Sequence, residues 1–75
     1  MKKGDKITIT WNGLVIPGWI ELASPNGVSL YVRWDYMEHE HMIAGHIGGM
    51  PLLRQDDGSY RTLFNSATVG IEAQQ

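Results

Sequence analysis

Cysteine is absent from the sequence, which excludes disulfide bonds and thiolate metal ligands. The same absence is typical of cytoplasmic proteins, and we expect that location. The apolar stretch LVIPGWI is interrupted by Pro17 and Gly18, and no run approaches the roughly 20 apolar residues of a membrane-spanning helix. Because the opening MKK is followed by Gly4 and Asp5, the sequence predicts no signal peptide, and we expect no membrane contact.

Positive charge is also scarce. The sequence has six lysines and arginines and eight acidic residues, which gives a net charge of −2. Nucleic-acid-binding domains usually carry a basic excess, so the composition counts against nucleic acid as a partner. The 75 residues suffice for one small domain, 1–75, which buries only about 60% of its unfolded surface. Association is a common remedy for so small a core, so we expect a homo-oligomer, most simply a dimer, or contact with another protein.

The sequence does contain several segments that are typical of tight turns. Asn12-Gly13 predicts a two-residue hairpin turn, because a type I′ turn needs positive φ at both central positions. The segment SPNG at 24–27 predicts a type I turn followed by a left-handed glycine. Asp57-Gly58 predicts a third turn between two strands.

Apolar and polar residues alternate between these turns, as they do in half-buried strands. With a two-residue loop at 12–13 and a three-residue loop at 25–27, both hairpins assign the same side chains of the middle strand to the interior. Pro17-Gly18 predicts a bend where this strand passes from one sheet to another. The residues predicted to be buried are Ile7, Ile9, Trp11, Ile16, Ile20, Leu22, Leu30, Val32, Leu53 and Val69.

The second half of the sequence completes a barrel. MPLLRQ and SYRTLF flank the third turn, ATVGIEA supplies a last strand, and residues 35–49 form one long connection. Five to six short antiparallel strands with one long loop predict an all-β, SH3-like barrel. An OB-like barrel is the alternative. It would need a helix between the third and fourth strands, which residues 37–44 could supply as one or two turns.

A family resemblance accompanies this pattern. The order GDKITITWNGLVIPGWIELASPNGVSLYVRWD, a glycine-rich loop, GMPLLRQDDGSYRTL and a final ATVGIE resembles small uncharacterised bacterial proteins carried on integron gene cassettes and phages. The resemblance implies an SH3-like barrel and covers most of the chain. Its markers are turns and core positions, so it implies no activity and no catalytic residue.

The plasmid-type dihydrofolate reductases are a second SH3-like family of similar size, and the chain is similar to them in GDKITI. Their active-site signature is a Val-Gln-Ile-Tyr run that lines the pore of a tetramer. The nearest segment here is VSLYV at 28–32, which lacks the glutamine amide that would hold the ligands. The departure puts a reductase activity in doubt.

All three histidines lie close together, in EHEHMIAGHIGG. His39 and His41 point the same way on an extended segment, and His46 could reach them after a turn at Gly45. Three imidazoles are a known Zn²⁺ arrangement. The flanking glutamates would point away, however, and nothing supplies the hydrogen-bond partners that metal-binding histidines need. The sequence therefore favours a solvated loop, no cofactor and no metal, with these histidines as the candidates should a metal bind.

The outer face of the central hairpin carries the most informative side chains. The predicted register places Trp19 opposite Arg33 and Glu21 opposite Tyr31, with Val15 extending the apolar strip along the same strand. Exposed aromatic patches with polar rims are typical of interfaces. These five residues are the predicted partner-binding surface.

The sequence thus favours a non-enzymatic binding module that acts through an exposed aromatic face and self-associates. The alternative is a small enzyme, either metal-dependent through His39, His41 and His46 or built as a symmetric, reductase-like pore. The identity of a ligand or partner is not encoded in any motif.

Overall fold

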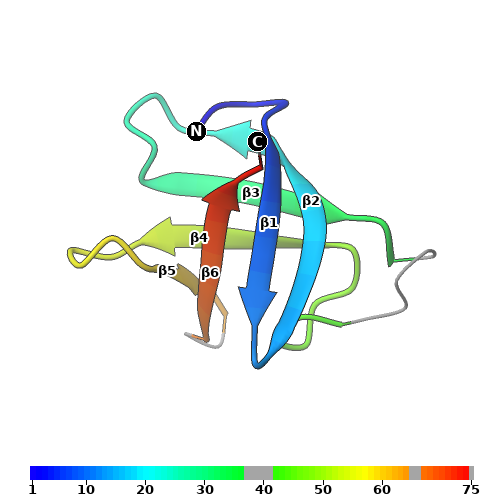
Figure 1. Ribbon diagram of the computed structural model, residues 1–75. Helices are drawn as coiled ribbons and strands as arrows, with labels where there is room; N and C mark the ends of the chain where they lie inside the picture. Colours follow the sequence, from blue (N-terminus) through cyan, green and yellow to red (C-terminus); the bar gives the residue numbers. More distant parts are fainter. Residues whose placement is uncertain (37–41, 65–66, 75) are drawn as a thin grey trace.

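The chain is described by a computed structural model covering residues 1–36, 42–64 and 67–74. Its named elements are all strands, each antiparallel to its neighbours, and they close in sequence order when β1 pairs with β6. Figure 1 shows β1, β2 and β6 crossing the direction of β3 and β4. The strands are β1 (Lys6–Trp11), β2 (Leu14–Ala23), β3 (Ser29–Trp34), β4 (Gly49–Arg54), β5 (Tyr60–Thr62) and β6 (Thr68–Ala73). The predicted all-β barrel is confirmed, and it is consistent with the SH3-like and OB-like types of small barrel.

The first hairpin follows the sequence prediction. Asn12 and Gly13 both have positive φ, at 50° and 84°, as a type I′ turn requires. The turn pairs Trp11 with Leu14 and brings Ile9 opposite Ile16. The inward parity of β1 and of the first half of β2 follows from this turn.

Strand β2 belongs to both halves of the barrel. It pairs with β1 through Leu14–Trp19 and with β3 through Gly18–Ala23. The two pairings overlap at Gly18 and Trp19. At Gly18 a Cβ atom would lie 2.5 Å from the carbonyl oxygen of Arg33 and 2.8 Å from Cδ1 of Ile9. Only glycine leaves room for so close a backbone approach. The predicted bend at Pro17-Gly18 is therefore the place where β2 stops pairing with β1 and begins to pair with β3.

The second hairpin differs from its prediction. The N–H of Ser24 donates to the carbonyl of Ser29, so the loop has four residues, 25–28, instead of three. The side chain of Asn26 accepts hydrogen bonds from the Ser24 hydroxyl and the Val28 N–H, and these bonds hold the longer loop. A bulge at Glu21 then restores the predicted pairing of Ile20 with its partner on β3.

The core contains most of the predicted residues but not all. Leu22 is 58% exposed, because the longer loop and the bulge turn it outward, opposite Tyr31. Leu53 is also exposed, since its neighbour Leu52 is the leucine of β4 that points inward. Trp11 is half-buried and packs against the core. The buried side chains are Ile7, Ile9, Ile16, Ile20, Leu30, Val32, Trp34, Ile43, Ala44, Met50, Leu52, Tyr60, Thr62 and Val69.

The predicted third hairpin and last strand are present. Gln55 and Gly58 are joined by a backbone hydrogen bond in the β4–β5 turn, and Gly58 has a φ of 88°. The helix that the OB-like alternative needs would fall largely on residues 37–41, which lie outside the described residues. Among the residues that are described, no helix is long and apolar enough to cross a membrane.

Candidate functional site

Trp19 and Tyr31 lie on the outer wall of the barrel, as the register predicted. Trp19 stands opposite Lys6 on β1 and opposite Arg33 on β3. Tyr31 lies two residues before Arg33 on the same face, which makes the two aromatic rings diagonal neighbours. Each ring is 37% exposed, so each is partly supported by the barrel and partly open to a partner.

Glu21 does not occupy its predicted place. It is the extra residue of the β-bulge, and Leu22 takes the position opposite Tyr31. The carboxylate of Glu21 instead accepts a hydrogen bond of 2.9 Å from the indole Nε1 of Trp19. That bond holds the orientation of the indole, which stays partly exposed. Lys6, Arg33 and Glu21 therefore bring both signs of charge to the surroundings of Trp19.

An apolar row crosses the outer wall next to Trp19. Leu22 on β2 is paired with Tyr31 on β3, and Tyr31 is paired with Pro51 on β4. Leu63 follows β5 and donates its backbone N–H to the carbonyl of Pro51. We name these four residues the apolar stripe. Leu53, exposed on the same face of β4, lies diagonally beside it.

One hollow borders the apolar stripe, and a second lies beside Trp19. One, of about 300 Å³, lies beside Leu22, Tyr31 and Pro51 and is lined in addition by the two serines that close the β2–β3 loop. The other, of about 460 Å³, we name the Trp19 pocket. It is lined by Gly4, Lys6, Pro17, Gly18, Trp19, Asp35 and Gln74.

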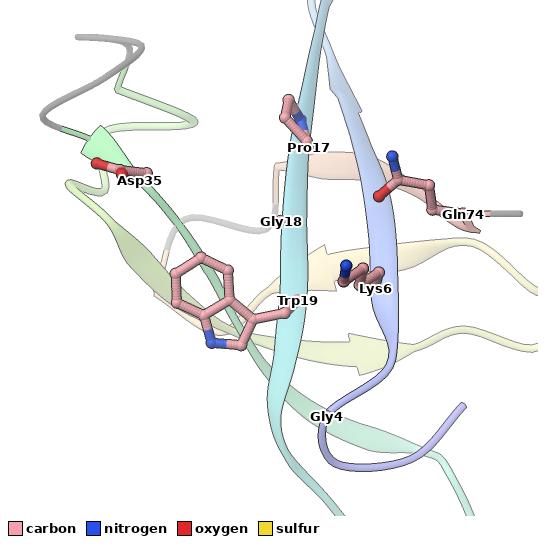
Figure 2. Close-up of a pocket in the computed structure, with 7 residues that line it drawn as sticks. All are labelled: Gly4, Lys6, Pro17, Gly18, Trp19, Asp35 and Gln74. Atoms are coloured by element: carbon pink, nitrogen blue, oxygen red, sulfur yellow. The ribbon is translucent and has the colours of Figure 1, made fainter.

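Figure 2 shows how the Trp19 pocket is built. The indole of Trp19 extends from β2 toward the side of Asp35, whereas Lys6 and Gln74 lie on the other side of β2. Pro17 and Gly18 lie between these two groups, so apolar surface occupies the middle. The polar groups form the rim. An apolar centre with a polar rim is the usual composition of a contact site.

Val15 is separate from the rest of the predicted surface. It is exposed, but it lies opposite Thr10 near the β1–β2 turn, and Pro17 stands between it and Trp19 on the same face of the strand. The structure thus brings together Trp19, Tyr31, Arg33 and Glu21, and it leaves Val15 outside the apolar stripe.

The histidine cluster is only partly described. His39 and His41 lie outside the described residues. His46 closes a turn with Ile43 through two backbone hydrogen bonds, and its ring centroid lies 6.2 Å from that of Phe64. Within the described part of the chain no three histidine, cysteine or acidic side chains form a group that could hold a metal ion. The metal-dependent alternative therefore stays a prediction.

Sequence reasoning missed three members of the apolar stripe. Leu22 was assigned to the core, and Pro51 and Leu63 were not singled out. One signal was available: in the PLLR segment only one of two consecutive leucines can face the core, so an apolar side chain on β4 has to point outward.

Comparison of the chain with protein-family models, with curated proteins and with solved structures found no match.

Proposed function

We propose that this chain is a non-enzymatic binding module that acts through its outer wall and that it self-associates as a symmetric homodimer. The observation that carries the proposal is the apolar stripe. Leu22, Tyr31 and Leu63 are exposed and form one row on the barrel wall with the half-buried Pro51, and Trp19 lies beside this row. Covering one such side chain gains about 1.5–3 kcal/mol. A chain with so small a core has much to gain from covering several.

The closed barrel favours contact through side chains. Since β1 pairs with β6, every strand has a neighbour on each side, and strand addition at a free edge is not the obvious route to a partner. A contact through the wall needs only a self-complementary patch when the two copies are related by a two-fold axis. Lys6 and Arg33 next to Glu21 provide both signs of charge for such a patch.

Two wider expectations belong to the same proposal. A cytoplasmic location is supported by the lack of cysteine. Kinship with proteins of integron cassettes and phages is supported by the order of turns and strands in the sequence. Neither bears on how the wall binds.

Sedimentation velocity over a concentration series tests self-association. The most informative variant is Leu22→Ser, because Leu22 belongs to the apolar stripe. Its side chain is exposed, so its loss leaves the core intact. Val15→Ser is the matched control: it removes another exposed apolar side chain of β2 that lies away from the apolar stripe. We expect the dimer of Leu22→Ser to be at least about tenfold weaker than wild type, and Val15→Ser to associate normally.

Two results would contradict the proposal. A wild type that stays monomeric at the highest concentration removes self-association and leaves the wall to a different protein. Equal weakening in both variants would show that the stripe has no special part in the contact.

A further inference from the structure

Three turns of the barrel contain an asparagine or aspartate followed directly by glycine. These steps are Asn12-Gly13, Asn26-Gly27 and Asp57-Gly58. At such a step the backbone nitrogen of the glycine can attack the side-chain carbonyl carbon of the preceding residue, because glycine has no side chain to hinder the approach. The attack needs a glycine N–H that a base can deprotonate and a side chain that can turn toward it. The three turns differ in both respects.

The step Asn26-Gly27 is held by hydrogen bonds on both sides of the reacting groups. The N–H of Gly27 donates to the carbonyl of Ser24 at 2.9 Å. Oδ1 of Asn26 accepts hydrogen bonds from the Ser24 hydroxyl at 2.7 Å and from the Val28 N–H at 3.1 Å. Deprotonation of Gly27 breaks the backbone bond, and rotation of the Asn26 amide toward Gly27 breaks the side-chain bonds. Since each of these bonds stabilises the loop, the structure opposes attack at this step.

The step Asp57-Gly58 is held in the same way. The N–H of Gly58 donates to the carbonyl of Gln55 at 3.0 Å. Oδ1 of Asp57 accepts hydrogen bonds from the backbone N–H and the hydroxyl of Ser59, at 2.9 Å and 2.6 Å. An ionised carboxylate is in addition a poor electrophile. This second turn is therefore also protected.

The step Asn12-Gly13 has none of these restraints. Both residues are exposed at the tip of the β1–β2 hairpin. Among the described residues, the N–H of Gly13 donates to no backbone carbonyl, and the side chain of Asn12 takes part in no hydrogen bond. The hairpin is closed by the flanking pair, Trp11 and Leu14. A Cβ atom on Gly13 would have no atom within 4 Å, so the surroundings of the step are open.

We propose that Asn12 is a site of spontaneous deamidation in the folded protein, whereas Asn26 is protected. A base removes the proton from the Gly13 nitrogen, and this nitrogen forms a bond to Cγ of Asn12. The bond from Cγ to Nδ2 then breaks, and the proton returned by the base lets Nδ2 leave as ammonia. Water adds to either carbonyl of the resulting cyclic imide and opens the ring, which leaves aspartate or isoaspartate at position 12.

The two products differ in their effect on the hairpin. Aspartate keeps the ordinary backbone and tolerates the positive φ of 50° at this position. Isoaspartate passes the main chain through Cβ and lengthens a two-residue loop, so Trp11 and Leu14 can no longer pair in the same way. The modification therefore acts on the turn that determines the register of β1 and β2.

Incubation of wild type at mildly alkaline pH, followed by mass spectrometry of its peptides, tests the proposal. A glutamate-specific protease cleaves after Glu21 and places the two asparagines on separate peptides. In the folded protein, checked by circular dichroism, we expect Asn12 to be deamidated at least about tenfold faster than Asn26. In denaturant, where both are unrestrained Asn-Gly steps, we expect comparable rates.

Ser24→Ala is the matched variant, because it removes the hydroxyl that donates to Asn26 and lies away from the β1–β2 turn. We expect faster deamidation of Asn26 and an unchanged rate at Asn12. Equal rates at the two asparagines of folded wild type, or a faster rate at Asn26, overturn the inference. A difference that persists in denaturant does so as well, since its cause would then be local sequence. These results do not depend on whether the chain self-associates.

Discussion

The ring of Tyr31 lies over the bare backbone of Gly49. A Cβ atom on Gly49 would be 2.9 Å from the Tyr31 hydroxyl oxygen, 3.1 Å from Cε1 and 3.3 Å from Cζ. The two residues sit on neighbouring strands, with Gly49 opposite Arg33 and Tyr31 two residues away on the same face. The missing side chain on β4 thus makes the space in which the aromatic ring at the centre of the apolar stripe rests.

Gly49→Ala should displace this ring with little effect on folding. Gly49 is not among the positive-φ residues, so alanine can adopt its backbone conformation. The clash is with the far end of a side chain that can rotate away. We expect a loss of unfolding free energy below about 1 kcal/mol, measured by urea denaturation, and a weaker dimer. An alanine variant with normal association would show that the position of the ring does not matter.

Gly18→Ala should destabilise the barrel strongly. The Cβ atom would meet the backbone carbonyl of Arg33 at 2.5 Å, which the β2–β3 pairing holds, and the Cδ1 methyl of Ile9 at 2.8 Å, which is packed in the core. We expect a loss of about 1–3 kcal/mol in the free energy of unfolding. Gly70→Ala is the matched control, because the nearest atom to its Cβ would be a Thr10 carbon at 3.3 Å. Similar midpoints for the two variants would contradict this account of β2.

The two leucines of β4 should respond oppositely to serine. Leu52 is fully buried, so Leu52→Ser removes core packing and buries a hydroxyl, and we expect a loss of about 3 kcal/mol or more. Leu53 is exposed, and Leu53→Ser should cost less than about 1 kcal/mol. Thermal and urea unfolding at low protein concentration measure both. A larger loss of unfolding free energy in Leu53→Ser than in Leu52→Ser would show that Leu53, as predicted from the sequence, is the leucine in the core.

Acid stability should depend on Asp57. Hydrogen bonds from the side chain and the backbone N–H of Ser59 lower the pKa of its carboxyl below the ordinary value, with a smaller contribution from Arg61. Because the folded pKa is the lower one, the charged form contributes stability above the unfolded pKa and loses it as the pH falls through the folded pKa. Between about pH 5 and about pH 2 the wild type should therefore lose stability more steeply than Asp57→Asn, which keeps the acceptor but does not titrate. Equal slopes in urea titrations across this range would exclude the effect.

Zinc binding should be absent or non-stoichiometric. The sequence offers the three histidines no evident hydrogen-bond partners to orient them, and His46 is engaged with the ring of Phe64. Calorimetric titration of wild type with Zn²⁺ is the measurement, with His46→Ala for comparison. A stoichiometric, tight isotherm that disappears in His39→Ala or His41→Ala would support the metal-dependent alternative instead.

Most of the candidate surface was predictable, and the part that was not has a definite cause. Asn12-Gly13 strongly favours a two-residue type I′ turn, and this turn determines the register of β1 and β2. The outward position of Trp19 therefore follows from local sequence. The length of the loop after Ser24 is not determined in this way, because the segment SPNG is compatible with a loop of three residues and with a loop of four. An error of one residue there misplaced Leu22 and Glu21 and hid the apolar stripe.

By itself the sequence determined the fold class, the first hairpin and the face on which the two aromatic rings lie. These features depend on turn residues and on the alternation of apolar and polar residues, both of which involve only residues close together in the sequence. Tertiary structure decided the bulge at Glu21, the choice of Leu52 over Leu53 for the core and the closure of β1 on β6. These depend on which side chains fit together inside a closed barrel. Packing between strands distant in sequence is a property of the whole chain, so no local pattern can specify it.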